Sequence, residues 1–358
     1  MKSQVLKELC EVISRRSFKA PSKMKNYVKG MTECRTTRYG GRVVQCPDCG
    51  KTQVLYNSCN KRGCPICYRH RQKQWEAHVR VRILHTNHFH LVFSIPEAYT
   101  GVWLLHKKEV MNAFFESVKK AIGKISSEYG ITPGCVASFQ THARGMAYKP
   151  HIHCALTDGG ILGKRFEWVR LGSISYTMLR DVVRQTFDKQ LRRLLQTNLE
   201  DLPKETEINE REWSVYGTYS KGDAEHIIGY MAHVSTGTVI NLNKGITIDS
   251  EKGTIRFSER HGEQIVETEL RKEVFCERYL NHIPVPHTVT VRYYGLYSND
   301  YSSVLDRLQE LFPGNENEDP EWTDMCPVCH KSMVVVTLLD PYEEPRPLEY
   351  YERKRVPA

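Results

Sequence analysis

Residues 149–160 read KPHIHCALTDGG, and this stretch decides how the middle of the chain is expected to fold. Its second residue is a proline and its last two are glycines, which is typical of a β-strand that begins after a proline and leads into a turn. Because successive strand side chains point to opposite faces, His151 and His153 share one face while Ile152 and Cys154 point into the core. Two neutral imidazoles on a rigid strand are suited to hold a divalent metal ion, although such pairs are more often structural.

A second pair of histidines with the same spacing, His88 and His90, provides a comparison within the chain. It leads directly into residues 91–96, LVFSIP, an apolar run that is typical of a buried strand. At least one of the two pairs therefore has a role other than binding a catalytic metal ion.

Positive charge is concentrated at the N-terminal end of the chain. Residues 1–80 contain 18 Lys or Arg and 5 Asp or Glu, a net charge of +13, whereas all 358 residues together carry +9. This asymmetry indicates a polyanionic partner for the N-terminal part, most simply nucleic acid. The cations expected to contact it are Arg62, Arg69, Arg71 and Lys73.

No stretch of the sequence is apolar for long enough to span a bilayer, and the first residues lack the apolar core of a signal peptide. The expected location is therefore the cytoplasm, in association with the nucleoid and with no membrane partner. In that compartment the twelve cysteines argue for metal binding rather than for disulfide bonds.

Two Cys-x-x-Cys motifs lie in the basic N-terminal part. Thiolates with this spacing close a tetrahedral structural zinc site, here in a unit too small to fold on apolar burial alone. The expected ligands are Cys46, Cys49, Cys64 and Cys67. Cys34 and Cys59 flank these motifs, and they either pack in the core or bind a second ion together with Cys326 and Cys329 near the C-terminus.

The order of expected elements indicates an α+β fold. The expected strands are 88–95, 135–139 and 151–156, of which the last two form a hairpin, and the expected helices are 103–129, 175–198 and 302–312. Strand, helix, strand, strand, helix favours an antiparallel sheet with packed helices. The region between 237 and 295 alternates as in a small β-region, and residues 313–320 form an acidic linker.

A further helix is expected at residues 223–236, where an apolar stripe repeats with helical spacing. Tyr230 borders this stripe, with His226 one turn before it and His233 one turn after it. A tyrosine bracketed by imidazoles is a candidate site residue. The alternative is a boundary tyrosine that covers the core, which is the commoner role.

These features together resemble the rolling-circle transposases of insertion-sequence family ninety-one, members of the HUH endonuclease superfamily (His, hydrophobic residue, His). The likeness extends over approximately residues 30–335. Its carriers are the cysteine-rich region, the first strand, the histidine motif, the tyrosine helix, an Arg-Tyr-Tyr-Gly segment and the late cysteine motif: residues 34–67, 89–96, 150–160, 229–232, 292–296 and 326–329. In this likeness the His88 and His90 pair belongs to the sheet rather than to the metal site.

The resemblance implies a metal-assisted nuclease centre. Tyr230 is the expected nucleophile, with His226 or His233 as a candidate proton acceptor. His151 and His153 are the expected ligands of Mg²⁺ or Mn²⁺.

Two positions depart from the family pattern. Many relatives carry a second tyrosine where this chain has Val234 and a histidine where it has Gln140. Glutamine is a usable oxygen ligand for Mg²⁺ or Mn²⁺, so Gln140 is the expected third ligand and His142, two residues further on the same face, is its alternative.

The resemblance divides the chain into four consecutive parts. These are a basic lead-in and zinc-binding domain (1–80), an HUH nuclease domain (81–240), a C-terminal β/α region (241–312), and an acidic linker with a cysteine motif and tail (313–358).

The function it implies is nicking and rejoining of single-stranded DNA, at the ends of a mobile element and at its target, through a covalent 5′-phosphotyrosine. One alternative is a replication initiator or relaxase with the same chemistry. The other is a non-catalytic, zinc-dependent DNA-binding protein. The oligomeric state is not indicated.

Overall fold

The computed structural model of the chain describes residues 2–15, 17–19, 21–163, 166–220, 224–236, 246–261, 264–284, 288–312, 325–347 and 349–351. The chain forms two compact units. The first combines residues 1–71, 240–277 and 318–358, and the second combines residues 72–239 and 278–317. Both mix helices with antiparallel sheets, which confirms the α+β class. None of the described helices combines the length and the apolar character needed to cross a bilayer.

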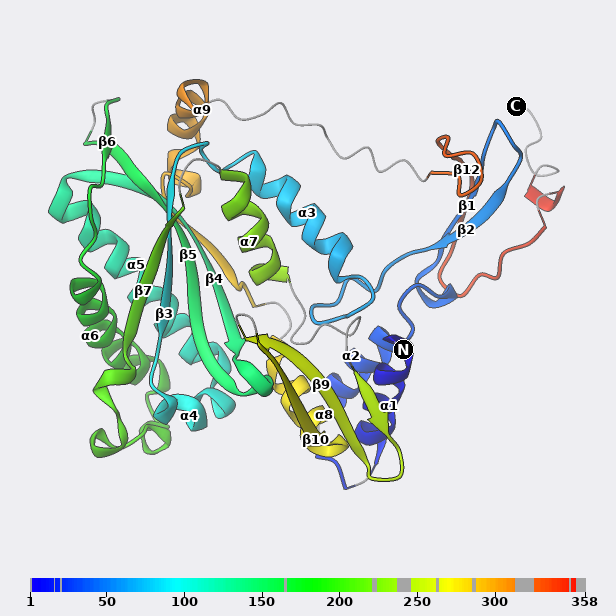
Figure 1. Cartoon of the computed structure of the whole chain (residues 1–358), viewed down its shortest axis with the longest axis horizontal. Coiled ribbons are helices and arrows are strands. Elements are labelled where there is room, and N and C mark those ends of the chain that lie inside the picture. The colour runs from blue at the N-terminus through cyan, green and yellow to red at the C-terminus, as the bar shows by residue number, and fades with distance from the viewer. Residues whose placement is uncertain are drawn as a thin grey trace. The chain divides into compact units, whose positions relative to one another are not determined.

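The second unit is built on a six-stranded antiparallel sheet (Figure 1). Its order is β11-β4-β5-β3-β7, and β6 pairs with β5 beside this path. The strands are β3 (His88–Ser94), β4 (Ile131–His142), β5 (Tyr148–Leu162), β6 (Trp168–Arg170), β7 (Ser214–Ser220) and β11 (Val291–Gly295). β4 and β5 form the expected hairpin and extend beyond the expected ranges.

Helices pack on both faces of this sheet. They are α4 (Thr100–Leu105), α5 (Lys107–Tyr129), α6 (Tyr176–Leu195), α7 (Ala224–Thr236) and α9 (Ser302–Leu311). The single helix expected at 103–129 is interrupted at His106, whose φ of −126° and ψ of 53° are not helical. α6 begins where the Ser175 hydroxyl accepts a hydrogen bond from the Met178 backbone N–H, and α5 ends at Gly130 in the left-handed region.

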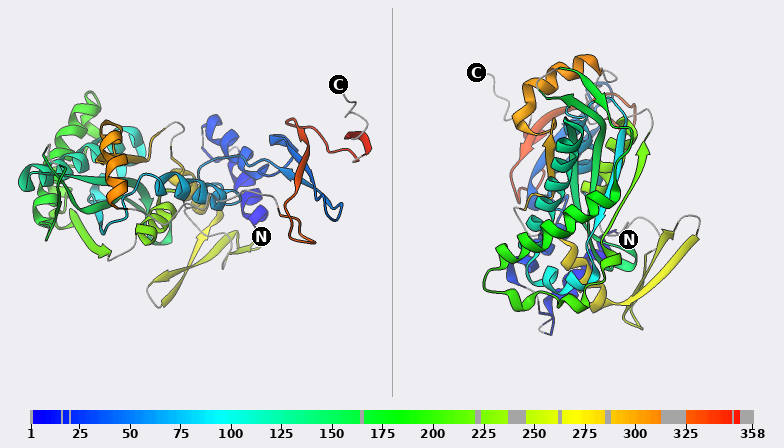
Figure 2. Two further views of the ribbon diagram at one scale, coloured as in Figure 1. Left: turned by 90° about the horizontal axis from the view of Figure 1, so that it is seen from above. Right: turned by 90° about the vertical axis from the view of Figure 1, so that its left-hand side faces the viewer.

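The two faces of the sheet have different roles. One face packs against α5 and α6 in the main hydrophobic core (Figure 2). The residues of β3 and β5 on that face are Phe89, Leu91, Phe93, Ile152, Cys154 and Leu156. By strand alternation the opposite face carries His90, His151 and His153. α7 packs on this second face, where Ile227 and Met231 contact a cluster that includes Ala155 of β5.

The first unit contains helices α1 (Lys2–Ser14) and α2 (Ser22–Thr32) and two three-stranded sheets. One sheet has the order β12-β1-β2, with β1 (Gly41–Gln45), β2 (Thr52–Tyr56) and β12 (Val334–Leu339). The other has the order β10-β9-β8, with β8 (Thr247–Asp249), β9 (Thr254–His261) and β10 (Gln264–Arg271). Helices α3 (Tyr68–Arg80) and α8 (Lys272–His282) contain boundaries between the two units.

The compact units do not follow the expected division into 1–80, 81–240, 241–312 and 313–358. Antiparallel pairing of β1 with β12 brings C-terminal residues into the N-terminal unit. The region between 237 and 295, expected to be a small β-region, contains β8, β9 and β10 but also helix α8. The acidic linker at 313–320 lies outside the described residues.

Candidate active site and metal centres

The histidine motif lies in the middle of the sheet, and its neighbours are set by strand register. His151 of β5 is paired with Gln140 of β4 on one side and with Ser94 of β3 on the other. His153 is paired with Ser138 of β4. The structure therefore brings together the two histidines and the glutamine that the sequence singled out.

His151 and Gln140 point acceptor atoms at each other, Nε2 of the histidine and Oε1 of the glutamine. His151 Nδ1 lies 2.6 Å from the Lys149 carbonyl oxygen and therefore carries the proton, because a carbonyl oxygen can only accept. Burial lowers the pKa of His151, so the ring is neutral near pH 7 and Nε2 has a free lone pair. The Gln140 amide nitrogen donates to the Val234 carbonyl at 2.8 Å, which turns Oε1 toward His151.

The two acceptor atoms, His151 Nε2 and Gln140 Oε1, are 3.1 Å apart. Two lone pairs at this distance repel each other unless a cation lies against both. Neighbouring ligands of an octahedral ion, with bonds of about 2.1 Å, are about 3 Å apart. The donor set and its spacing therefore fit a divalent cation bound by one imidazole nitrogen and one amide oxygen.

Tyr230 reaches the same face from α7. Its hydroxyl oxygen is 3.4 Å from His153 Nδ1, and its side chain is 38% exposed. Burial raises the pKa of Tyr230, and the nearby Tyr216 raises it further. Tyr230 is thus partly exposed and its hydroxyl lies beside an imidazole, but the hydroxyl needs help to ionise at neutral pH.

Contacts at both ends of α7 hold Tyr230 in place. Near the start of the helix, Glu225 accepts two hydrogen bonds from the Arg80 guanidinium, at 2.9 and 2.6 Å. Near its end, Ser235 donates to Ser138 of β4 at 3.0 Å, and Gln140 binds the carbonyl of the neighbouring residue. Tyr230 lies between these contacts, which tie the start of α7 to α3 and its end to β4.

Val234 stands where many relatives have a second tyrosine. Its side chain is buried, at 7% exposure, and so contributes apolar packing only. Tyr216 of β7 is the described tyrosine that offers an exposed ring nearby. It is paired with Val92 of β3 and is 58% exposed.

The structure separates the two histidines of the second pair. His88 is fully buried, with Nδ1 2.8 Å from the Thr86 carbonyl and Nε2 2.9 Å from the Tyr297 hydroxyl. Burial lowers its pKa to about 4, and its role is structural. His90, by contrast, lies at the candidate site, with Nε2 3.0 Å from His153 Nδ1.

His90 is the site residue that the sequence reasoning missed. The apolar run that follows His90 predicts a buried strand, and every second residue of that strand, such as Leu91 and Phe93, is indeed in the core. That same alternation places His90 on the face of the sheet opposite the core and could have indicated it.

The remaining histidines named from the sequence are arranged as follows. His142 packs its ring against His282 at 5.8 Å between centroids. Burial, and then His282, His151 and His233, lower the pKa of His142 to about 3. Among the described residues, no three histidines have their donor nitrogens all within 4.8 Å of one another. His226 and His233 lie on the exposed side of α7.

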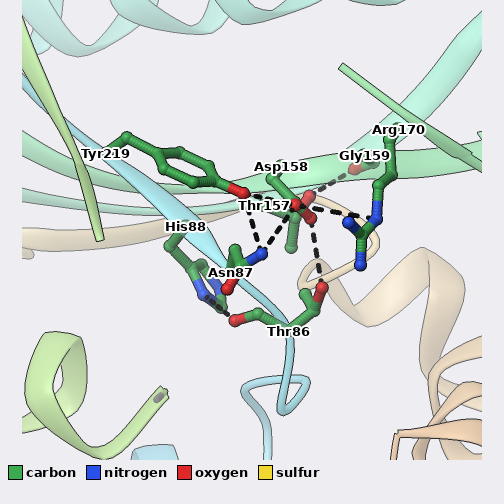
Figure 3. A network of polar contacts seen from close by, with 8 residues as sticks. All are labelled: Thr86, Asn87, His88, Thr157, Asp158, Gly159, Arg170 and Tyr219. Atoms are coloured by element: carbon green, nitrogen blue, oxygen red, sulfur yellow. Dashed lines mark hydrogen bonds and ion pairs between the residues drawn. The ribbon is translucent and has the colours of Figure 1, made fainter. Parts of the chain in front are cut away.

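Asp158, which follows the histidine motif, is held in a network at the other end of β5 (Figure 3). It is 1% exposed and accepts hydrogen bonds from Thr86 Oγ1 at 3.1 Å, Asn87 Nδ2 at 3.2 Å and Tyr219 OH at 3.0 Å. Arg170 Nε lies 4.0 Å away. It lies five positions beyond the last histidine of the motif, which is about 17 Å along the strand. Asp158 therefore ties β3, β5 and β7 together and does not contact the candidate cation.

The first unit contains two groups of four cysteines whose sulfurs lie within 4.8 Å of one another. The first group is Cys34, Cys59, Cys64 and Cys67, and the second is Cys46, Cys49, Cys326 and Cys329. Four thiolates at such spacing match a structural zinc site, so the unit has the ligands for two zinc ions. The expected grouping of Cys46 and Cys49 with Cys64 and Cys67 is wrong.

The β1–β2 hairpin explains this pairing. Cys46 and Cys49 lie at its closed end, whereas Cys34 precedes β1 and Cys59 follows β2 at its open end. Strands of five residues separate the two ends by about 15 Å, which is too far for one ion. A second ion was anticipated with Cys326, but its partners are the first Cys-x-x-Cys motif rather than Cys34 and Cys59.

The two motifs of the second zinc group fold into the same turn. The Cys46 N–H donates to Lys51 O at 2.9 Å, and the Cys326 N–H donates to Lys331 O at 2.8 Å. Backbone N–H groups of Cys329 and Val328 point at the Cys326 sulfur and lower the pKa of its thiol to about 7. The backbone is thus arranged for thiolate ligands.

The basic residues expected to contact DNA lie around the first zinc group and on α3. Arg71 Nη1 donates to the Lys61 carbonyl at 2.8 Å, and burial lowers the pKa of Arg62. Arg69 Nε donates to the Tyr68 hydroxyl at 3.2 Å. Arg69, Arg71 and Lys73 all lie on α3. The positive charge is therefore part of the zinc-stabilised structure.

Comparison with known proteins gives two family matches. Residues 134–303 match the model of a putative transposase family, and residues 5–95 match a transposase zinc-binding domain. The first match includes Gln140, the histidine motif and Tyr230, and the second includes the first zinc group.

Two curated relatives are transposases. A putative transposase of Sinorhizobium fredii is 25% identical over 349 residues, which cover 86% of this chain and 87% of that protein. The transposase for insertion sequence element IS801 of Pseudomonas savastanoi pv. phaseolicola is 23% identical over 288 residues, which cover 76% of this chain and 70% of that protein. No solved structure gives a significant match.

The α+β unit with its tyrosine-bearing site, the cysteine centres and these matches define the class: the chain is a transposase, an enzyme that cuts and joins DNA strands. Within that class it belongs to insertion-sequence family ninety-one, and its N-terminal zinc-binding domain is the one that this family carries.

Proposed function

We propose that this transposase nicks and rejoins single-stranded DNA at the ends of its element, in rolling-circle transposition, with Tyr230 as the nucleophile. The observation that carries the proposal is the arrangement on one face of the sheet. The hydroxyl of a partly exposed tyrosine lies 3.4 Å from His153, and the neighbouring strand positions His151 and Gln140 bring two acceptor atoms together at 3.1 Å.

The metal ligands in this proposal are His151, His153 and Gln140. When bound there, Mg²⁺ or Mn²⁺ would polarise the scissile phosphate and offset the charge that develops on its oxygens. The site fits such an ion because His151 and Gln140 present lone pairs 3.1 Å apart, each oriented by its own hydrogen bond. His142 is the alternative third ligand, but its ring packs against His282.

Tyr230 attacks the phosphorus atom in line and forms a 5′-phosphotyrosine, and the leaving strand keeps a free 3′-hydroxyl. The phosphodiester energy is conserved in the covalent link, so attack by a 3′-hydroxyl on the same link rejoins DNA. The phenolic proton must leave during attack, because burial raises the pKa of Tyr230. His226 and His233, on the same helix as Tyr230, are the candidate acceptors of this proton.

The zinc-stabilised unit would hold the DNA. Its cations Arg62, Arg69 and Arg71, with Lys73 further along α3, would bind backbone phosphates, and this binding would weaken as salt concentration rises.

The test uses the zinc-loaded full chain, Mn²⁺, and end-labelled single-stranded oligonucleotides that cover both ends of the element. Wild-type protein should form an adduct that survives denaturation in SDS, and Tyr230→Phe should form none. An adduct that persists in Tyr230→Phe would move the nucleophile to another tyrosine, of which Tyr216 lies on the same face of the sheet.

The sequence left two alternative functions open, and a different observation tests each of them. The family assignment favours transposition over replication initiation or plasmid transfer. If neither protein forms an adduct with DNA that it demonstrably binds, the chain is a zinc-dependent DNA-binding protein without nuclease activity.

A further inference from the structure

His90 lies next to both functional side chains of the candidate site. It belongs to β3, which pairs with β5, and its ring centroid is 4.5 Å from that of Tyr230 and 5.3 Å from that of His153. No function assigned above uses it. The question is what a third imidazole does between the nucleophile and a metal ligand.

The geometry of the two rings describes a hydrogen bond. His90 Nε2 and His153 Nδ1 are 3.0 Å apart, and the ring planes are parallel within 3°. With centroids at 5.3 Å, the two nitrogens face each other along a nearly straight line in the ring planes. One nitrogen must therefore carry the proton and the other must accept it.

The direction of this hydrogen bond decides whether His153 can bind a metal ion. If His90 donates, the proton of neutral His153 is on Nε2, and His153 has no lone pair left for a cation. If His153 donates through Nδ1, its Nε2 lone pair is free. Imidazoles that bind metal ions nearly always donate their other N–H to a fixed acceptor.

The neighbouring ligand follows this second pattern. His151 is oriented by the Lys149 carbonyl oxygen, which lies 2.6 Å from its Nδ1. In the part of the chain that the structure describes, no backbone carbonyl faces His153 Nδ1. The Tyr230 hydroxyl lies 3.4 Å from this nitrogen, and the nearer atom, in line with it, is His90 Nε2 at 3.0 Å.

We infer that His90 is a positioning residue that accepts the Nδ1 proton of His153 and so directs the Nε2 lone pair of His153 toward the cation. This inference rests on the proposed function and adds to it the residue that selects the ligand's tautomer. The inclined contact between the His90 and Tyr230 rings gives His90 a second role, in which it holds the metal ligand and the nucleophile at a fixed spacing.

A direct ligand role for His90 fits less well. Its Nε2 points along the line to the His153 nitrogen, so the two lone pairs do not converge on a common point. Among the described residues, His90, His151 and His153 also do not place three nitrogens within 4.8 Å of one another.

The test compares two variants. His90→Phe keeps a flat ring against Tyr230 but removes the acceptor, and His90→Gln supplies an amide oxygen as acceptor without the ring. Mn²⁺ alone is titrated calorimetrically into each zinc-loaded full-length protein, and thermal unfolding confirms that each variant is folded. We expect His90→Phe to weaken Mn²⁺ binding by about 10- to 100-fold and His90→Gln to recover most of that loss.

A second readout is the number of imidazoles bound to Mn²⁺, counted by electron spin-echo spectroscopy. Two are expected in wild type and in His90→Gln. Three in wild type, falling to two in His90→Phe, would overturn the inference and make His90 a ligand. Equal Mn²⁺ affinity in wild type and His90→Phe would also overturn it. Failure of wild type to bind Mn²⁺ at all would instead contradict the proposed function.

Discussion

The most informative residue of the candidate site is Gln140. A glutamine between two strands would ordinarily donate and accept, yet its amide nitrogen is taken by the Val234 carbonyl and its oxygen faces the His151 lone pair. The same side chain thus links α7 to β4 and supplies a donor atom to the site. The resemblance to the family singled out this residue, because many relatives carry a histidine there, but the hydrogen bond that orients it comes from a helix much later in the chain.

Replacing Gln140 should separate these two roles. We expect Gln140→Leu to weaken Mn²⁺ binding by at least about 10-fold, because a ligand atom is lost. Ser138→Ala is the matched control, since it removes the other hydrogen bond between β4 and the end of α7 but no donor of the site. Calorimetric titration with Mn²⁺ measures both. Equal weakening in the two variants would show that α7 docking, rather than ligation, matters at Gln140.

His282 makes folding sensitive to acid. Its Nε2–H donates to the Met146 carbonyl at 2.9 Å and its Nδ1 accepts from Thr141 at 2.8 Å, so both nitrogens are satisfied in the neutral ring. Burial lowers its pKa to about 4 in the folded state, below the usual 6.5 of the unfolded chain.

The unfolded state therefore binds the proton first as pH falls. The contribution of His282 is fully present above pH 6.5 and is lost progressively between pH 6.5 and 4, by roughly 2 kcal/mol at pH 5. We expect His282→Gln to show a shallower fall in the free energy of unfolding between pH 7.5 and 5, measured by urea titration. The same slope as wild type would rule out His282 as a source of the acid sensitivity.

At the scale of elements, β4, β5 and β6 approach one another closely at the far end of β5. Gly159 and Gly160 end the histidine motif, and a Cβ on either would meet the backbone of the neighbouring strand. For Gly160 the nearest atom is the Thr132 carbonyl oxygen, at 2.4 Å. The sequence predicted a turn at these glycines. In the structure they lie inside β5, because only glycine leaves room for the strands on either side.

Gly160→Ala should therefore destabilise the second unit. The clash involves backbone atoms that cannot rotate away, so we expect a loss of about 1–3 kcal/mol in the free energy of unfolding. Gly101→Ala in α4 is the control, because a Cβ there meets no atom within 4 Å. It should leave stability unchanged or raise it by up to about 1 kcal/mol. Denaturant titration of both variants measures the difference, and equal stability would contradict the close approach.

At the scale of the whole molecule, the two ends of the chain meet in one zinc-binding unit. β12 pairs with β1, and the Cys326 and Cys329 motif lies against Cys46 and Cys49. The chain between β1 and β12 contains all six strands of the sheet that carries the candidate active site. The first unit is therefore complete only after the C-terminal motif has been made.

The number of bound zinc ions tests this arrangement. Wild-type protein should release two zinc ions per chain on denaturation, and Cys326→Ser combined with Cys329→Ser should release one. Cys10→Ser, outside both groups, should still release two. A colorimetric assay of released zinc measures the stoichiometry. Two ions in the double variant would show that Cys46 and Cys49 do not depend on the C-terminal motif.

The sequence by itself determined the local features of this protein. Strand alternation placed His151 and His153 on one face, helical spacing placed Tyr230 beside the apolar stripe of its helix, and the Cys-x-x-Cys spacing identified zinc ligands. Each of these depends on the backbone repeat of a single element, which a short stretch of sequence contains in full.

The tertiary structure alone decided which of these features meet. Strand pairing brought His90 to His153, and the β1–β2 hairpin separated two cysteine motifs that looked like one site. The physical reason is that such contacts depend on the path of the chain between distant segments. Many side chains contribute to that path, and no single motif contains it.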